Sequence, residues 1–372
     1  MTIWNPAAVR RRENLCLTEV EKAFVRSKLP LAPDGNYYVD AVFEGGGVKG
    51  TAFLGALRCF DEVGIRVRKV AGTSAGAITA ALVAAEFSID ELERIVGELD
   101  YVNDLLCKKT SALILNGCPA NDLNQPQRMI GNLLLAHVMG QNGMGQYSGQ
   151  PFVHWLARTL GDRLPNFGAL IPAGATEWYH ERALKIIASD ISRNEMLLLP
   201  NDLELFDLNP MDFSVAEAVR LSMSIPFFFE PGQVGDSVIV DGGILSNFPL
   251  WIYDAPKHRM PHCPTFGLQL TDGERSPRTI NDPLDLLFGL LETMMVARDL
   301  YEQRTNDLGR VITIETTGIT ATQFNLTTEE KDFLYLQGYT STRDFLINHW
   351  SWERHLEQRG YCPEKSLVGV AD

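Results

Sequence analysis

The sequence contains no C-x-x-C pair of cysteines, and its basic residues do not outnumber its acidic ones. Its 372 residues include six cysteines, none of them in a C-x-x-C pair. Cysteines scattered through a chain of this length form no disulfide framework, so we expect reduced thiols and a cytoplasmic protein. Lysine and arginine total 33 against 47 aspartates and glutamates, which gives a formal net charge of −14. We therefore expect no nucleic-acid partner.

Long hydrophobic runs are also missing. The most apolar stretch, AITAALVAA at residues 77–85, is far shorter than the ~20 residues that cross a bilayer. The N-terminal stretch MTIWNPAAVRRRENLCLTEVEK contains no apolar segment of the kind found in secretory signals. Contact with lipid is therefore expected from the aqueous side, as peripheral membrane association.

Short β-rich runs alternate with helical patterns through the middle of the chain. Strands are predicted over 38–43, 67–71, 183–188, 237–240, 265–270 and 311–315, and helices over 48–63 and 75–85. This alternation predicts an α/β fold with a mostly parallel central sheet flanked by helices on both faces. We divide the chain into an N-terminal helical extension (1–35), a catalytic domain (36–320) and a C-terminal helical extension (321–372).

The N-terminal extension carries a helix-start signal. Thr18 and Glu21 match a capping box. In the helix that follows, we expect Val20, Phe24 and Leu29 to form the apolar face.

Two further segments have alternative interpretations. Residues 116–149 are rich in Asn, Gln, Gly and Met, and 140–149 is either a surface insertion or a lid over a site. We favour the lid. The helix predicted over 283–306 carries an apolar stripe, which is more typical of a core than of a lipid-docking face. The stripe consists of Leu284, Leu287, Leu290, Leu291, Met294 and Met295.

A G-x-S-x-G pattern, Gly72-Thr73-Ser74-Ala75-Gly76, lies between a predicted strand and a predicted helix. That context suits a nucleophilic serine, because a sharp strand-to-helix turn projects the hydroxyl outward. The start of the helix also favours developing negative charge. An ordinary serine N-cap is the alternative, and we favour the nucleophile.

A glycine-rich stretch, EGGGVKG, follows the first predicted strand. Gly45, Gly47 and Gly50 match G-x-G-x-x-G by letter, but the acidic residue that a dinucleotide site needs after the next strand is absent, and so is any Gly-Lys pair of a Walker A motif. Bare N–H groups at a helix start can instead donate to the oxyanion of an ester under attack. The spacing therefore favours an oxyanion loop.

A serine nucleophile needs a base. None of the seven histidines lies in a segment that resembles a catalytic loop. The better candidate is Asp241, which ends an apolar strand and is followed by Gly242 and Gly243. Taken alone, this pattern is more typical of a simple Asp-Gly turn.

Together the three stretches resemble the patatin-like phospholipase family, whose pattern is G-G-G-x-[RK]-G, then G-x-S-x-G, then D-G-[GA]. Here these are Gly45–Gly50, Gly72–Gly76 and Asp241–Gly243, in the family's order, within a resemblance that covers about 38–270. The segment SVAEAVRLSMSIPFFFEP, at 214–231, is similar to the helix and turn before the family's aspartate strand.

The resemblance implies a Ser-Asp dyad without histidine, with Ser74 as nucleophile and Asp241 as general base. It implies an oxyanion hole at Gly45, Gly46 and Gly47, most of all at the last two. Lys49 either contacts a phosphate head group or, as we favour, pairs with a carboxylate. No metal and no cofactor are expected. Glu44 stands where the family often has Asp.

The resulting prediction is a lipid acyl hydrolase, a phospholipase A or lysophospholipase, that cleaves carboxylic esters of phospholipids through an acyl-enzyme. One alternative is an esterase for neutral lipids or small esters. The other is a nucleotide- or phosphate-binding sensor module that uses the glycine-rich loop. The resemblance also allows an activating ligand or protein partner, for which the sequence identifies no site.

Overall fold

The computed structural model describes residues 4–101, 107–108, 144–171, 176–256, 259–273, 280, 286, 289–290, 293–294 and 308–360. Within these residues, a central sheet has the strand order β11-β10-β1-β2-β5-β9-β8, with β6 paired to β5 beside this path. The strands are β1 (Tyr37–Phe43), β2 (Ile65–Thr73), β5 (Ala183–Asp190), β6 (Glu195–Leu199), β8 (Gly232–Val234), β9 (Ser237–Asp241), β10 (Thr265–Thr271) and β11 (Val311–Glu315).

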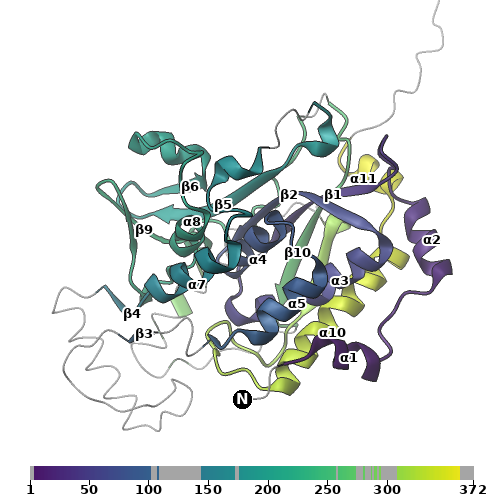
Figure 1. The fold of residues 1–372 in the computed structure, drawn as a ribbon, viewed down its shortest axis with the longest axis horizontal. Coiled ribbons are helices and arrows are strands. Elements are labelled where there is room, and N and C mark those ends of the chain that lie inside the picture. Colours follow the sequence, from purple (N-terminus) through teal and green to yellow (C-terminus); the bar gives the residue numbers. More distant parts are fainter. Residues whose placement is uncertain are drawn as a thin grey trace, which may run out of the picture.

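The sheet is parallel on one side and antiparallel on the other. Strands β11, β10, β1, β2 and β5 run parallel to their neighbours. Strands β6 and β9 pair antiparallel with β5, and β8 pairs antiparallel with β9. The predicted α/β class, a mostly parallel sheet flanked by helices, is confirmed (Figure 1). The sequence did not predict the antiparallel pairing of β9, which decides where Asp241 lies.

Helices cover the sheet and extend beyond it at both ends of the chain (Figure 1). Among the described residues they are α1 (Pro6–Arg12), α2 (Glu19–Ser27), α3 (Ala52–Val63), α4 (Ala75–Ala84), α5 (Ile89–Glu98), α7 (Gln150–Leu160), α8 (Val215–Ser222), α10 (Thr328–Asp344) and α11 (Trp352–Gln358). The predicted helix 48–63 is α3 preceded by a 3-10 turn, Gly47–Thr51.

A second, small sheet joins β3 (Cys107–Lys108), β4 (Gly145–Ser148) and β7 (Phe227–Phe229). Strand β4 runs parallel to β7. The predicted lid, 140–149, therefore contributes β4, while 140–143 lie outside the described residues and the lid function stays a prediction.

The central strands bury side chains on both faces, as expected for a parallel sheet. Ala41, Phe43 and Val70 join the main core, whereas Val42 and Ala71 belong to a separate cluster. That second cluster is closed by residues 248–253, which follow the Asp241 strand. The chain segment after Asp241 is thus anchored on the sheet by its own apolar side chains.

The N-terminal helix begins as predicted but buries a different face. The capping box of Thr18 and Glu21 is present at the start of α2. The prediction is wrong for Val20, which is 79% exposed, and for Phe24, which is 49% exposed. It is right for Leu29, which is buried just after the helix, and within α2 the buried residue is Val25. Because α2 ends at Ser27, it is too short for its apolar face to be read from periodicity alone.

The C-terminal helix α10 crosses α3 at very short range. A Cβ added to Gly55 would lie 2.0 Å from the carbonyl oxygen of Tyr335, and one added to Gly338 would lie 1.8 Å from that of Ala52. Real Cβ atoms do not approach so closely, so glycine is required on both helices. Helix α10 therefore packs directly on α3, which belongs to the predicted domain 36–320. The domain boundary at residue 320 stays a prediction.

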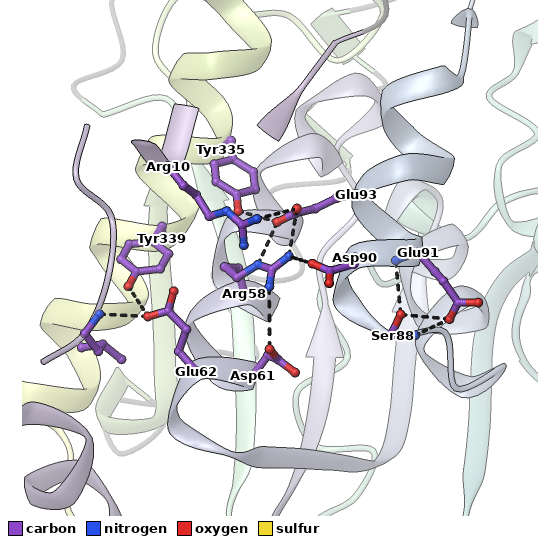
Figure 2. Close-up of polar contacts among 11 residues, drawn as sticks. Arg10, Arg58, Asp61, Glu62, Ser88, Asp90, Glu91, Glu93, Tyr335 and Tyr339 are labelled. Carbon is purple, nitrogen blue, oxygen red and sulfur yellow. Dashed lines mark hydrogen bonds and ion pairs between the residues drawn. The ribbon is translucent and has the colours of Figure 1, made fainter. Parts of the chain in front are cut away.

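A buried polar network joins α1, α3, α5 and α10 (Figure 2). The Nε of Arg58 donates to Glu93 Oε1 at 2.9 Å, and its Nη2 lies 2.9 Å from Glu93 Oε2. Arg58 also contacts Asp90. The Tyr335 hydroxyl donates to Glu93 Oε1 at 2.6 Å, and Arg10 lies 3.5 Å from Glu93 Oε2. A carboxylate this deeply buried depends on its partners, because leaving it unpaired carries the full desolvation cost.

Replacing Arg58 by methionine is expected to lower the free energy of unfolding by about 3–5 kcal/mol, since it leaves Glu93 buried without its main cation. Urea unfolding followed by circular dichroism measures this. The control is Arg94→Met, which removes the exposed pair with Glu98 and should cost less than about 1 kcal/mol. Equal effects for the two variants would contradict a structural role for the Arg58–Glu93 pair.

The apolar stripe predicted over 283–306 is described only in part. Leu290 is 54% exposed and Met294 is 48% exposed, so for these two the expected core position is wrong. Leu284, Leu287, Leu291 and Met295 lie outside the described residues. In the described part of the chain, no helix is long and apolar enough to cross a bilayer.

Candidate active site

Ser74 occupies a strained turn between β2 and α4. Its backbone angles are φ 53° and ψ −121°, and a positive φ is uncommon for a residue with a Cβ. The flanking glycines are required sterically: a Cβ on Gly72 would lie 2.2 Å from the Gly76 oxygen, and one on Gly76 would lie 2.2 Å from the Phe43 oxygen. The N–H of Ser74 donates to the buried Ser222 hydroxyl at 2.9 Å. This geometry matches the turn predicted from G-x-S-x-G.

Asp241 reaches the same place from β9. The strand pairs antiparallel with β5, placing Asp241 opposite Ala188. Its N–H donates to the Ser224 oxygen at 2.9 Å, and its Oδ1 accepts the Gly243 N–H at 2.8 Å. A Cβ on Gly242 would lie 2.2 Å from the Ile187 oxygen, so the turn must pass close to β5.

The Asp241 carboxyl is fully buried. Burial raises the pKa of Asp241 to about 6, while the Ser74 hydroxyl and the Gly243 N–H act in the opposite direction by favouring the carboxylate. Among the described residues, Oδ2 has no hydrogen-bond partner. One carboxylate oxygen is therefore held by the turn, and the other is left for a proton.

The glycine-rich loop packs against three other segments. A Cβ on Gly45 would lie 2.2 Å from Asn247 Oδ1, and one on Gly46 would lie 2.4 Å from Leu270 Cδ1. Gly47 has a φ of 57°, and its Cβ would lie 1.9 Å from the Ala321 oxygen. The glycines are thus required by the packing of the protein itself, whatever ligand the loop binds.

The N–H groups at the start of this loop differ in whether another described residue accepts a hydrogen bond from them. Gly45 N–H donates to the Asn247 oxygen at 3.1 Å. Among the described residues, none accepts a hydrogen bond from the N–H of Gly46 or Gly47. Gly50 sits against the elbow, since its Cβ would lie 3.3 Å from the Ala75 Cβ. Two unused donors are therefore held on a loop that packs beside Ser74.

Comparison with known proteins identifies the family. Residues 41–253, more than half of the chain, match the patatin-like phospholipase family. The chain is also 35% identical over 324 residues to YqhO, an uncharacterized protein of Bacillus subtilis, covering 85% of this chain and 100% of that one. This chain belongs to the patatin-like phospholipase family.

Two further proteins are similar to this chain. The uncharacterized protein R571 of Acanthamoeba polyphaga mimivirus is 24% identical over 319 residues, covering 82% of this chain and 93% of that protein. The crystal structure of VipD from Legionella pneumophila superimposes with a TM-score of 0.50 at 18% identity, covering 87% of this chain and 70% of that chain. This second likeness shows the patatin fold. At the family level, the chain is a lipid acyl hydrolase.

Charged residues of the patatin loop are used inside the protein. Lys49 is nearly buried and pairs with Asp272, which agrees with the favoured carboxylate partner rather than a head group. Glu44, at the position where the patatin family often has Asp, accepts the Leu270 N–H through Oε2 at 2.6 Å. Both side chains tie the loop to the end of β10.

No described histidine contacts Ser74 or Asp241. His355 stacks on Trp352, His262 stacks on Trp178, and His349 bonds to Asp344. His137 and His258 lie outside the described residues.

Three residues at this patatin site were missed from the sequence. Ser222 accepts the Ser74 N–H, the Ser246 oxygen accepts the Thr73 hydroxyl at 3.0 Å, and Asn247 bonds to Gly45. Ser222 lies in the helix and turn noted for its resemblance, and Asn247 in the stretch that carries Asp241. Their contacts reach across 148 and 202 positions, which no local pattern reports.

Proposed function

We propose that this protein is a serine-dependent phospholipid acyl hydrolase with a Ser74–Asp241 dyad. The observation that carries the proposal is the strained Ser74 turn beside the buried carboxyl of Asp241, whose pKa the Ser74 hydroxyl lowers. A carboxylate is normally too weak a base for a serine hydroxyl. Burial makes Asp241 more basic, with a pKa of about 6, which is closer to the working pH that suits a general base.

In the first half-reaction, the Ser74 hydroxyl attacks the ester carbonyl carbon as its proton passes to the Asp241 carboxylate. The negative oxygen of the tetrahedral intermediate would accept the N–H groups of Gly46 and Gly47, because Gly45 N–H is already used by Asn247. Removing one such donor typically costs about 100- to 1,000-fold in rate.

The intermediate collapses to an acyl-enzyme when the bond to the leaving alcohol breaks and Asp241 returns the proton to that alcohol. Water then attacks the acyl group, with Asp241 taking its proton, and Ser74 leaves as the protonated hydroxyl with release of the fatty acid. Each proton taken is returned, so no further reactant is needed.

The proposed substrate is a phospholipid at a membrane surface, reached from the aqueous side in the cytoplasm. Family membership supports this substrate class. Neutral lipids and small esters contain the same reacting ester bond, so a comparison of substrates decides between them and phospholipids.

The chain is expected to react once with an alkyl fluorophosphonate, forming a bond from Ser74 to phosphorus as fluoride leaves. Intact-mass measurement should show one equivalent, and peptide mapping should place it on Ser74. Phosphatidylcholine vesicles and triacylglycerol emulsions are then compared by mass spectrometry of the released fatty acids. Free fatty acid from the vesicles in excess of that from the emulsion supports the phospholipase assignment.

The control is the same chain unfolded in urea, which should not be labelled, because Ser74 then has no base. Faster hydrolysis of the emulsion would favour the neutral-lipid esterase. Absent labelling together with saturable binding of ATP in equilibrium dialysis would overturn the hydrolase and support the nucleotide-binding module.

A further inference from the structure

The segment that follows Asp241 contacts each of the three motifs. Asp241 itself interacts with Ser74. Ser246 accepts the Thr73 hydroxyl through its backbone oxygen at 3.0 Å, which holds the residue before Ser74. Asn247 contacts Gly45 twice: its backbone oxygen accepts the Gly45 N–H at 3.1 Å, and its Nδ2 donates to the Gly45 oxygen at 3.1 Å. Residues 241–247 therefore join base, elbow and glycine loop.

The two Asn247 contacts fix two successive peptide units of the loop. A peptide unit is planar and almost always trans, so its C=O and N–H point in opposite directions. The Gly45 oxygen and the Gly46 N–H belong to one unit. Holding that oxygen toward Asn247 therefore points the Gly46 N–H away from Asn247, where no described residue accepts it.

The Asn247 side chain is poorly explained as a device for stability alone. It is 7% exposed, and its Oδ1 has no hydrogen-bond partner among the described residues. A buried unpaired polar atom costs on the order of 1–3 kcal/mol. Its Nδ2 lies 3.5 Å from Glu44 Oε1, at the limit of a hydrogen bond. The shorter hydrogen bond of this side chain, at 3.1 Å, is the one that Nδ2 donates to the Gly45 oxygen.

Other contacts hold the two ends of the loop, through Glu44 and Val48. Among the described residues, only Asn247 bonds to the peptide unit between Gly45 and Gly46. Glycines have the largest backbone freedom of any residue, and three stand in a row at 45–47. A donor that must be aimed at an oxyanion before the reaction loses its value when its peptide can rotate. A contact from outside the loop is therefore needed at the peptide unit that carries the Gly46 N–H. Asn247 makes that contact through the Gly45 oxygen.

We propose that Asn247 is a positioning residue for the oxyanion donors. Its side chain sets the Gly45–Gly46 peptide plane, so that the N–H groups of Gly46 and Gly47 face the reacting carbonyl. Because Asn247 follows Asp241 by one short segment, the base and the oxyanion donors are placed by the same piece of chain. This inference rests on the proposed function.

The test compares the wild type with Asn247→Ala, which removes the Nδ2 donor but keeps the backbone contact. With a p-nitrophenyl ester, kcat is expected to fall about 10- to 100-fold while KM stays within about threefold. The rate of labelling by the fluorophosphonate should fall by a similar factor, because negative charge then develops on a phosphoryl oxygen in the position of the ester carbonyl oxygen. The pH midpoint of kcat/KM and the thermal unfolding midpoint should stay close to those of the wild type.

Asn348→Ala serves as the matched control, because it removes an Nδ2 donor whose 2.7 Å bond, to Asp344 Oδ1, lies outside the three motifs, and kcat should stay within about threefold. If Asn247→Ala does not fold, Asn247→Leu replaces it: an apolar side chain of similar size cannot donate to Gly45, and the same loss of kcat is expected.

Unchanged kcat in a folded variant at Asn247 would overturn the proposal, as would a loss that merely follows the unfolded fraction. These outcomes differ from failure of the proposed function. If the wild type hydrolyses esters and Ser74→Ala does not, an active Asn247→Ala sinks only the positioning role. If the wild type neither hydrolyses nor is labelled, both proposals fail together.

Discussion

Replacing Ser74 by alanine is expected to lower phospholipid hydrolysis by about 10⁴- to 10⁶-fold, the range found when a serine nucleophile is removed. No other hydroxyl can take over, since the position of the attacking oxygen is set by the Ser74 backbone at φ 53°. The measurement is fatty-acid release from phosphatidylcholine vesicles, followed to long times so that a residual rate can be determined.

The fold of Ser74→Ala should survive, because alanine keeps the Cβ and meets the same backbone strain as serine. The N–H at this position still donates to Ser222. An unfolding midpoint close to that of the wild type would show this. Loss of activity with the midpoint retained then reports chemistry rather than unfolding.

Ser237→Ala is the control for a buried serine that plays no chemical part. Ser237 is buried at the start of β9, at the opposite end of the strand from Asp241. Its variant should hydrolyse lipid at nearly the wild-type rate. Activity of Ser74→Ala above one hundredth of the wild type would mean that another group attacks the ester, and the dyad would have to be abandoned.

The sequence predicts the parts of the site that are local. The strand before Ser74 and the helix after it could be recognised because the motif, the apolar run and the helix-forming stretch are contiguous. The same holds for Asp241 at the end of β9. Each is a short pattern whose residues touch one another or their immediate neighbours.

What the sequence could not supply is how these pieces meet. The antiparallel pairing of β9 with β5 brings Asp241 beside Ala188, and nothing in the β9 sequence specifies that partner. From the sequence, the glycines at 45–47 supply bare N–H groups for an oxyanion. The structure shows in addition that their Cβ positions are taken by Asn247, Leu270 and Ala321. Such contacts depend on tertiary packing.

The rate of hydrolysis by the wild type is expected to rise with pH and to reach half of its maximum near pH 6. Asp241 can accept the Ser74 proton only as a carboxylate. Its pKa is raised to about 6 by burial, so below that pH the protonated form predominates and kcat/KM falls about tenfold per pH unit. An ordinary aspartate, with a pKa near 4, would give a flat profile over pH 5–8.

Asp241→Asn should lower kcat/KM by about 10²- to 10⁴-fold, the usual contribution of a general base, and should remove the midpoint near pH 6. Asp190→Asn is the matched control: Asp190 is also fully buried, lies on β5 opposite Ile239 of β9, and has an Oδ2 without a hydrogen-bond partner among the described residues. It should keep the wild-type midpoint. A midpoint near pH 6 that persists in Asp241→Asn would assign the base to another group, and a flat profile in the wild type would contradict the raised pKa of Asp241. If the midpoint is lost only in Asp241→Asn, it reports the titration of the Asp241 carboxyl. Burial has then made this carboxyl basic enough to deprotonate a serine.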